Sequence, residues 1–180
     1  MLLPTILTAV PLPKAPGLSW RPVAEEFLAP AFAIESASYP EDEAATEAKL
    51  QMRIREAPEF FSGAFTEEGS LCGFICGTLT SSAELTDESM SLHEPAGTTL
   101  CIHSVVVTES MRRQGIALWM LRSYMKQVTE LQRVSRVLLI CKENLVCLYE
   151  AAGFRSLGPS AVVHGQDQWI DMEFGGAGKE

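Results

Sequence analysis

Hydrophobic and polar positions change their spacing several times along the chain, and each change marks an expected element. Over residues 114–128, apolar residues recur every three or four positions, which predicts an amphipathic helix. Residues 41–58 predict another helix, because they open with the acidic residues Glu41–Glu43, which suit the positive end of a helix dipole, and close at Pro58. A further helix is expected within 24–39.

Shorter apolar and β-branched runs predict strands. These runs lie near 20–23 and over 60–65, 70–80, 98–107, 134–141, 160–165 and 167–174. Gly73 and Gly77 indicate a bulge or the close approach of another group, and the polar residues 81–98 predict a surface excursion. A short helix within 144–154 is expected to be capped by Gly153. The resulting order, β-α-α-β-β-β-α-β-α-β-β without an internal repeat, is typical of an α+β domain.

Length and composition suit one globular domain. The chain has 180 residues, of which 47% are hydrophobic. We expect an extended N-terminal arm over 1–18, a single domain over 19–174 and a flexible tail over 175–180. The arm is apolar, but it lacks a basic start and is broken by prolines, which argues against a signal peptide. No run of 18 apolar residues is present, so no membrane span is expected.

Charge and cysteine content narrow the classes of function. A net charge of −9 disfavours nucleic-acid binding and mildly favours a cationic small molecule. The five cysteines are odd in number and include no CxxC pair, which argues against a disulfide framework and a zinc site and favours a cytoplasmic protein. His93 and His164 lack metal-ligand spacing and are expected in surface or loop positions, so we expect no metal.

The stretch VVVTESMRRQGIA, residues 105–117, has the chemistry of an anion site. A β-branched strand ends in a turn that carries Arg112 and Arg113 and leads through Gly115 into the helix. The first N–H groups of a helix have no partner within it, and the dipole adds positive potential there. Gly115 and Ala117 keep side chains away from the backbone, so a diphosphate could lie close to it.

The spacing Arg112-x-x-Gly115-x-Ala117 after a strand resembles the acyl-CoA loop of the Gcn5-related N-acetyltransferases. The segments SLHEPAG, CIHSVVVTESMRRQG, LLICKENLVCLYEAAGFRSLGPSAVVHG and DQWIDMEF run in the same order as in the arylalkylamine N-acetyltransferases of that superfamily, and the resemblance covers roughly residues 24–174. It implies a mixed, mostly antiparallel central sheet flanked by helices. Acyl-CoA would bind where the central strands splay apart.

The resemblance also implies a mechanism in which acetyl-CoA, the amine and the protein form a ternary complex without an acyl-enzyme. His103 matches a proton acceptor of the family, and Cys101 stands where the family has a second histidine. Tyr149 matches the residue that protonates the departing thiolate. The backbone of the strand would hold the thioester. Residues implied to contact acetyl-CoA are Val105, Val106, Val107, Arg112, Arg113, Gln114, Gly115, Ile116, Ala117, Leu118 and Tyr149.

For the amine, the resemblance implies a pocket that includes Pro40, Ile140, Asp167 and Trp169. Trp169 could stack on a ring or cover an ammonium, and Asp167 could favour a second positive charge. The expected substrate is an arylalkylamine such as serotonin, tryptamine or phenylethylamine, and polyamines or diamines are the alternative. A CoA-binding module without catalysis is a third reading. No terminal phosphorylation motif for 14-3-3 partners is apparent, and a monomer is the default.

Overall fold

The computed structural model describes residues 17–86, 88–163 and 165–175. Its strands and α-helices follow the predicted order: β1 Leu18–Pro22, α1 Leu28–Ser36, α2 Glu47–Glu56, β2 Phe61–Thr66, β3 Leu71–Thr80, β4 Thr99–Val107, α3 Ile116–Glu130, β5 Arg136–Lys142, α4 Val146–Ala151, β6 Arg155–Pro159 and β7 Trp169–Phe174. Short 3₁₀ turns lie at Glu25–Phe27, Pro58–Phe60, Glu109–Met111 and Glu143–Leu145.

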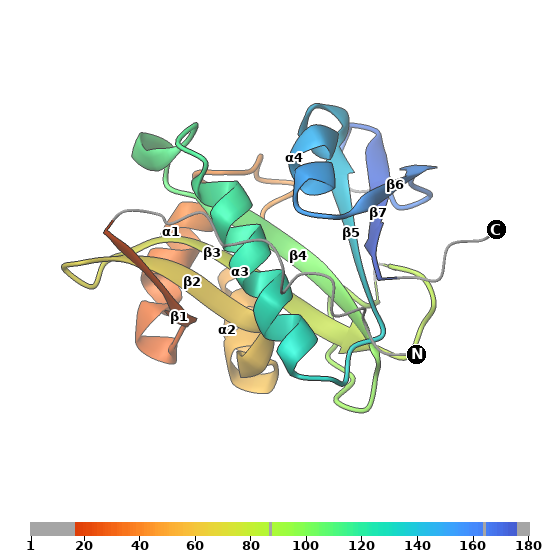
Figure 1. Ribbon diagram of the computed structural model, residues 1–180, viewed down its shortest axis with the longest axis horizontal. Helices are drawn as coiled ribbons and strands as arrows, with labels where there is room; N and C mark the ends of the chain where they lie inside the picture. Colours follow the sequence, from red (N-terminus) through yellow and green to blue (C-terminus); the bar gives the residue numbers. More distant parts are fainter. Residues whose placement is uncertain (1–16, 87, 164, 176–180) are drawn as a thin grey trace.

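The strands form one sheet in the order β1-β2-β3-β4-β5-β7-β6 (Figure 1). Every neighbouring pair is antiparallel except β4 and β5, which run parallel. The expected α+β fold with a mixed, mostly antiparallel sheet is therefore confirmed.

Helices cover both faces of this sheet. Helix α3 crosses one face, and α4 lies on the same side, over β5 and β7 (Figure 1). The buried side chains of α3, among them Met120, Tyr124 and Met125, belong to the main apolar core. Helices α1 and α2 cover the other face, where Ala31 and Leu50 pack in a second cluster. The apolar stripe predicted for α3 thus faces the sheet.

A bulge in β4 sits at the centre of the sheet. Cys76 pairs with Ser104 and Gly77 pairs with Ile102, so His103 is an extra residue with no counterpart on β3. A bulge was expected at this point of β3, and Gly77 also meets the predicted close approach, because a Cβ there would lie 2.6 Å from the carbonyl oxygen of Cys101. The extra residue shifts the alternation of side chains between the two faces of the sheet by one position.

The consequence of this bulge is visible in the packing of β4. Before it, Leu100 and Ile102 pack in the main core with α3. After it, Val105 and Val107 contact that core, while Val106 packs in the cluster with α1 and α2. The even positions therefore face α3 before the bulge and the odd positions face it afterwards.

Two predicted boundaries were wrong. Helix α2 begins at Glu47, because the side chain of Thr46 accepts a hydrogen bond from the backbone N–H of Lys49 and caps the helix there. The acidic residues 41–43 precede that cap. The sixth strand is Arg155–Pro159 rather than 160–165, since the chain enters the sheet directly after Gly153, and the exposed Val163 lies in the following loop.

Other expectations have mixed outcomes. Gly153 follows α4 with a φ of +98°, as predicted for a cap. Strand β1 begins at Leu18, the last residue of the predicted arm, whereas 1–16, His164 and 176–180 lie outside the described residues. His93 was expected in a surface or loop position, and it does lie in the segment between β3 and β4, but its ring is buried and accepts a hydrogen bond from the N–H of Leu79.

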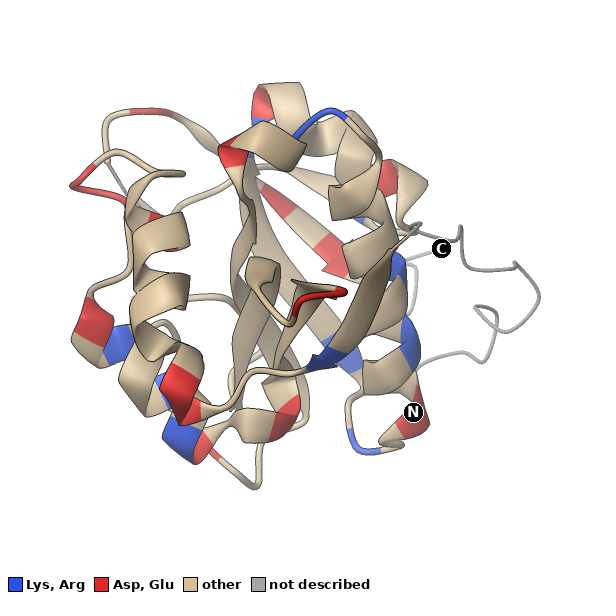
Figure 2. Ribbon diagram, turned by 90° about the vertical axis from the view of Figure 1, so that its left-hand side faces the viewer, with Lys and Arg blue, Asp and Glu red and all other residues tan. Residues whose placement is uncertain are grey.

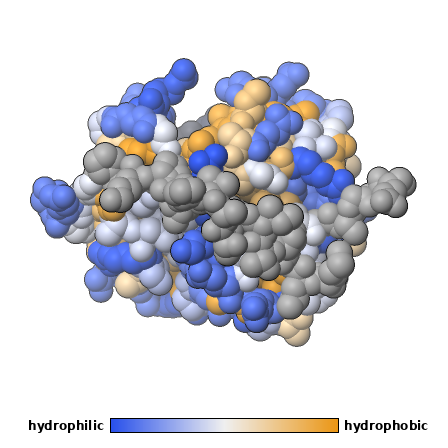
Figure 3. All heavy atoms as spheres, in the orientation of Figure 1, coloured by the Kyte–Doolittle hydropathy of each residue, from blue (hydrophilic) through white to orange (hydrophobic). Residues whose placement is uncertain are grey.

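The described surface is mixed in character. Figure 2 shows acidic and basic residues distributed over helices, strands and connecting segments rather than gathered on one element. On the face seen in Figure 3, groups of hydrophobic residues alternate with hydrophilic ones.

Candidate active site

Strands β4 and β5 separate near the middle of the sheet. Their parallel pairing covers only Thr99–Cys101, although β4 continues to Val107 and β5 to Lys142. A cavity of about 50 Å³ lies at this separation. It is lined by Tyr39, Glu43, Leu85, Met90, Ile102, His103, Ser104, Val105, Leu139, Ile140, Tyr149 and Trp169. The space has room for only a few water molecules, so a bulky ligand requires its walls to move.

A chain of hydrogen bonds determines which nitrogen of His103 carries the proton. The hydroxyl of Thr78 donates its single proton to the carbonyl oxygen of Ser89 at 2.8 Å. The same hydroxyl oxygen lies 2.7 Å from Nε2 of His103, so it accepts a hydrogen bond from Nε2–H. Nδ1 is therefore the bare nitrogen, and it is buried without a partner among the described residues. The ring therefore has an unpaired nitrogen lone pair, and His103 lines the cavity.

The surroundings of His103 keep its ring neutral. Burial lowers the pKa of His103 well below its ordinary value, and the positive charges of Arg53 and Lys49 lower it further. Arg53 is itself buried on α2, where its guanidinium donates to the carbonyl oxygen of Met90. A neutral imidazole at neutral pH can accept a proton.

Two tyrosines face the same cavity. Burial raises the pKa of Tyr149 well above its ordinary value, and Tyr39 and Cys141 raise it further, so the phenol keeps its proton. Helix α4 positions Tyr149, and its ring packs edge-on against Phe154 at 5.9 Å. Burial and the carboxylate of Glu35 raise the pKa of Tyr39, and a hydrogen bond from the backbone of Val105 opposes this shift.

Cys101 lies beside the cavity rather than on its wall. The thiol is fully buried and packs in a small cluster with Leu85 and Leu138. Burial raises its pKa to about 11, against the effects of a hydrogen bond with Ser89 and the charge of Arg136. The structure brings His103 and Tyr149 together and leaves Cys101 outside them.

The predicted acyl-CoA turn adopts a conformation that requires glycine. Gly115 is the N-cap of α3 with a φ of +78°, and no atom lies within 4 Å of a Cβ built there. Arg113 also has a positive φ, of 63°, and is exposed. Arg112 donates from Nε to the carbonyl oxygen of Val107 at 2.9 Å and from Nη2 to the hydroxyl of Ser38 at 3.0 Å. Arg112 thus supports the turn, while the backbone at Gly115 stays open.

The remaining implied contacts divide between the turn and the helix. Gln114 is exposed and donates to the carbonyl oxygen of Ser110 at 3.4 Å. Ile116 is buried, and Ala117 and Leu118 are partly buried against the main core. Among the implied contacts, the exposed residues are therefore those of the turn, Arg112–Gly115.

Two of the four predicted substrate residues, Asp167 and Trp169, contact a lysine. Nζ of Lys142 lies 2.6 Å from Oε1 of Glu43, 2.6 Å from Oδ2 of Asp167 and 5.1 Å from the centre of the Trp169 ring. Trp169 and Ile140 line the cavity, whereas Pro40 is exposed and is not on its wall. Asp167 is exposed as well.

A buried carboxylate joins three segments behind the site. Oε1 of Glu35 accepts hydrogen bonds from the N–H of Ala45 and from the hydroxyl of Ser104, both at 3.0 Å. Burial raises the pKa of Glu35, against the effects of those hydrogen bonds and of Arg53. Glu35 therefore ties the loop after α1 to the residue next to His103.

Several of these residues were not predicted from the sequence. Leu85, Ser89 and Met90 belong to a segment expected to be a surface excursion, and it instead supplies cavity wall and the acceptor for Thr78. Thr78 has no distinguishing signal, because a threonine is ordinary in a strand. The acidic run that contains Glu43 was visible, but it was assigned to the start of a helix.

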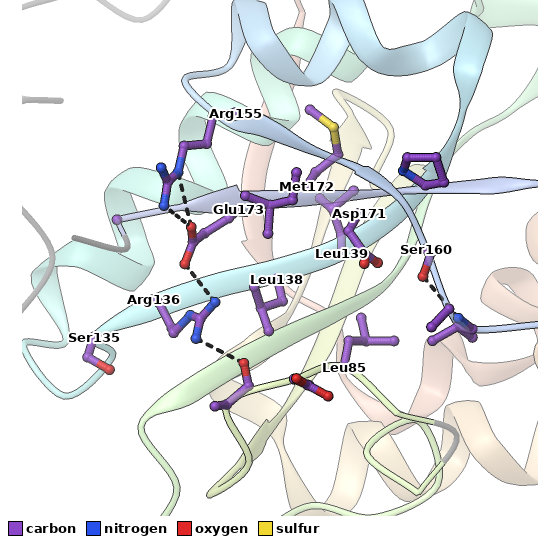
Figure 4. Close-up of a pocket in the computed structure, with 17 residues that line it drawn as sticks. Leu85, Ser135, Arg136, Leu138, Leu139, Arg155, Ser160, Asp171, Met172 and Glu173 are labelled. Atoms are coloured by element: carbon purple, nitrogen blue, oxygen red, sulfur yellow. Dashed lines mark hydrogen bonds and ion pairs between the residues drawn. The ribbon is translucent and has the colours of Figure 1, made fainter. Parts of the chain in front are cut away.

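A larger cavity, of about 810 Å³, lies over β5, β7 and β6. Figure 4 shows Arg136 and Arg155 approaching Glu173 from opposite sides. Arg136 lies 2.7 Å from Oε1 of Glu173, and Arg155 pairs with Oε2. None of the predicted site residues lines this cavity, and its arginines are committed to a buried carboxylate.

Known proteins resemble this chain in sequence and in fold. The family described as Acetyltransferase (GNAT) family matches residues 20–154. Serotonin N-acetyltransferase from Mesocricetus auratus is 37% identical over 116 residues, which are 64% of this chain. The match takes in 56% of that relative, so the chain spans little more than half of its length.

Solved structures share the fold at low identity. The loading GNATL domain of CurA from Lyngbya majuscula has a TM-score of 0.78 at 13% identity, covering 88% of this chain and 97% of that one. The GphF GNAT-like decarboxylase in complex with isobutyryl-CoA has a TM-score of 0.76 at 15% identity, covering 87% and 98%. Within residues 17–86, 88–163 and 165–175, no helix is long and apolar enough to cross a membrane, and no His, Cys, Asp and Glu group could hold a metal.

Proposed function

Because the chain belongs to the acetyltransferase (GNAT) family, we propose that it transfers an acetyl group from acetyl-CoA to the primary amine of an arylalkylamine. The observation that carries this proposal is the bare Nδ1 of His103, a residue that lines the same cavity as Tyr149 with its protonated phenol. A proton acceptor and a proton donor at one opening in the sheet are what amine acetylation requires.

The residues present fit acetyl-CoA. The separation of β4 from β5 leaves the Val105–Val107 backbone without a pairing partner on β5, and the empty space at Gly115 suits a diphosphate held by backbone N–H groups. Arg113 would add positive charge at the exposed end of this path. Acetyl-CoA, when bound, supplies the thioester whose acetyl group is transferred.

The side chains of the cavity divide the proton transfers between them. His103 would take a proton from the ammonium of the substrate at Nδ1, directly or through a water in the cavity, while Nε2–H stays bound to Thr78. The amine nitrogen then forms a bond to the thioester carbon as the carbon–sulfur bond breaks. Tyr149 would give its proton to the departing sulfur and regain one, through water, from the nitrogen that becomes the amide, and a backbone N–H of β4 would stabilise the developing oxyanion.

The similarity to serotonin N-acetyltransferase supports an arylalkylamine as the acceptor. Trp169 and Ile140 on the cavity wall offer apolar contacts for a ring. A polyamine or diamine remains the alternative, and the structure weakens its main argument, because Asp167 is paired with Lys142. The third reading, a CoA-binding module without catalysis, conflicts with the joint presence of His103 and Tyr149 at the cavity.

The test is thiol release from acetyl-CoA with tryptamine, phenylethylamine, spermidine and 1,4-diaminobutane as acceptors, alongside calorimetric titration of CoA. We expect turnover with the aromatic amines and no comparable rate with the polyamines. A preference for spermidine would support the alternative. Tight CoA binding without turnover on any amine would support the silent module.

A further inference from the structure

Lys142 stands out among the residues around the cavity, because its ammonium is held from three sides. Glu43 comes from the loop after α1, Asp167 from the loop before β7, and Trp169 from the start of β7. The side chain of Glu43 is 3% exposed, that of Lys142 is 26% exposed, and that of Asp167 is 64% exposed. The ammonium therefore lies between the buried wall of the cavity and solvent.

These contacts are those that an ammonium ligand would make. Carboxylate oxygens and the face of a tryptophan are the groups by which proteins bind alkylammonium ions. Partial burial acts to lower the pKa of Lys142, but hydrogen bonds with Asp167 and Glu43 outweigh it, so the pKa lies above its ordinary value. The groups around this position thus suit a cation, and the ammonium of Lys142 occupies it.

We propose that Lys142 occupies the position that the second ammonium of a diamine would take, and that it thereby restricts the acceptor to amines with a single cationic group. The inference rests on the proposed function, whose substrate class it narrows. Glu43 and Trp169 line the same cavity as His103 and Tyr149, so the Lys142 ammonium lies beside the space where the acceptor would react.

A diamine would meet two obstacles. To use Glu43 and Asp167, it must displace a side chain tethered beside them, which acts at an effective concentration on the order of millimolar or higher. To bind without displacing Lys142, it must place its second ammonium next to an existing positive charge. A like charge near the binding position is a common means of rejecting a wrong ligand. An arylalkylamine carries no second charge and meets neither obstacle.

This arrangement gives Asp167 and Trp169 a different role from the one that the sequence predicts. The pair was expected to contact the substrate directly. In the structure both contact Lys142, so they position the residue that discriminates between acceptors. Trp169 can still contact an aromatic ring from the cavity side, because it lines the cavity.

The test compares 1,4-diaminobutane with n-pentylamine, two acceptors of equal length that differ by one ammonium. Each is titrated into CoA-saturated wild-type protein and Lys142→Met, and each is assayed as an acceptor. We expect the affinity for 1,4-diaminobutane, relative to n-pentylamine, to rise about tenfold or more in Lys142→Met. Lys142→Arg keeps the charge and should keep the wild-type ratio. Lys126→Met removes an exposed lysine on α3 that pairs with Glu130, and it should leave the ratio unchanged.

An unchanged affinity ratio in folded Lys142→Met would overturn the proposal. If that variant does not fold, Lys142→Gln is used instead, because its amide can still donate to Glu43, and the same ratio decides. The titration also separates this inference from the proposed function. If no amine is acetylated by the wild type, the proposed function fails, whereas the two binding affinities still show whether Lys142 excludes the second ammonium.

Discussion

The hydroxyl oxygen of Thr78 lies 2.7 Å from Nε2 of His103, and this contact determines the direction in which the imidazole can accept a proton. Because Thr78 gives its own proton to the carbonyl of Ser89, the ring must donate from Nε2. The proton acceptor is consequently Nδ1, and its orientation depends on a strand neighbour and on a segment outside the sheet.

Thr78→Val removes the hydroxyl with little change in volume. The Nε2–H of His103 loses its acceptor, so the other tautomer becomes accessible and the bare nitrogen no longer faces the amine in every molecule. We expect kcat to fall by about tenfold, the equivalent of one net hydrogen bond, while the KM for acetyl-CoA changes little. Thr78→Ser keeps the hydroxyl and should keep the rate; a valine variant with wild-type kcat would contradict the assignment of Nδ1.

His103→Ala and Cys101→Ala test which residue accepts the proton. The first should lower kcat by about 10²-fold or more, as the loss of a positioned base does. The second should change kcat only slightly, because Cys101 does not line the cavity and its pKa is raised to about 11. Steady-state kinetics with tryptamine measure both, and equal small losses would exclude His103 as the base.

Tyr149→Phe removes the phenolic proton and keeps the ring against Phe154. Turnover should fall by about 10²-fold, the lower end of what a proton donor contributes, because thiolate is a good leaving group. CoA affinity, measured by calorimetry, should be nearly unchanged. A loss of affinity that matches the loss of turnover would assign Tyr149 to binding rather than to proton transfer.

Gly115→Val tests the acyl-CoA turn. No atom crowds the position, so the expected effect comes from the φ of +78°, which costs a residue with a Cβ roughly 1–2 kcal/mol. The turn should leave its open conformation, and acetyl-CoA affinity should collapse while the fold persists. Gly69 offers a matched control, since it has a φ of +83° and no atom within 4 Å of its added Cβ. Gly69→Val should suffer similar strain but retain acetyl-CoA affinity, and unchanged affinity in Gly115→Val would refute the site.

The lowered pKa of His103 also predicts how stability depends on pH. The unfolded chain protonates this ring below about pH 6.5, whereas the folded protein does so only at lower pH. The stability linked to His103 is therefore present above the unfolded pKa and is lost as the pH falls from it towards the folded pKa. In His103→Gln, the Tm should fall less between about pH 7 and about pH 5 than in the wild type. Parallel curves for the two proteins would show that the folded ring titrates normally.

Local signals were sufficient for most of the fold. The stripe in 114–128 gave α3 because its apolar side chains face the sheet, and Gly153 ended α4 as expected. The start of α2 was misplaced because acidic residues suit any first turn, and only the hydrogen bond between Thr46 and Lys49 locates the cap. The first strand of the final hairpin was misplaced because the two valines at 162–163 have strand propensity but lie in a loop, whereas the second strand was expected where β7 lies.

The candidate site was harder to predict, since its residues come from segments far apart in the sequence that only the folded sheet brings together. His103 and Tyr149 followed from the resemblance, and both line the cavity. Thr78, Glu35 and Lys142 act through contacts between segments far apart in sequence, for which a single sequence gives no signal. The role expected for Asp167 changed for the same reason, because its partner is fixed only when β5 and the loop before β7 come together.

The bulge at His103 has a consequence for how this strand can vary during evolution. Substitutions at its positions change single contacts, whereas losing the extra residue would restore regular alternation and leave one position where the bulge now holds two neighbours, His103 and Ser104. The imidazole that bonds Thr78 and the hydroxyl that donates to Glu35 would then compete for that single position. The strand can therefore accept new side chains, but its length is constrained.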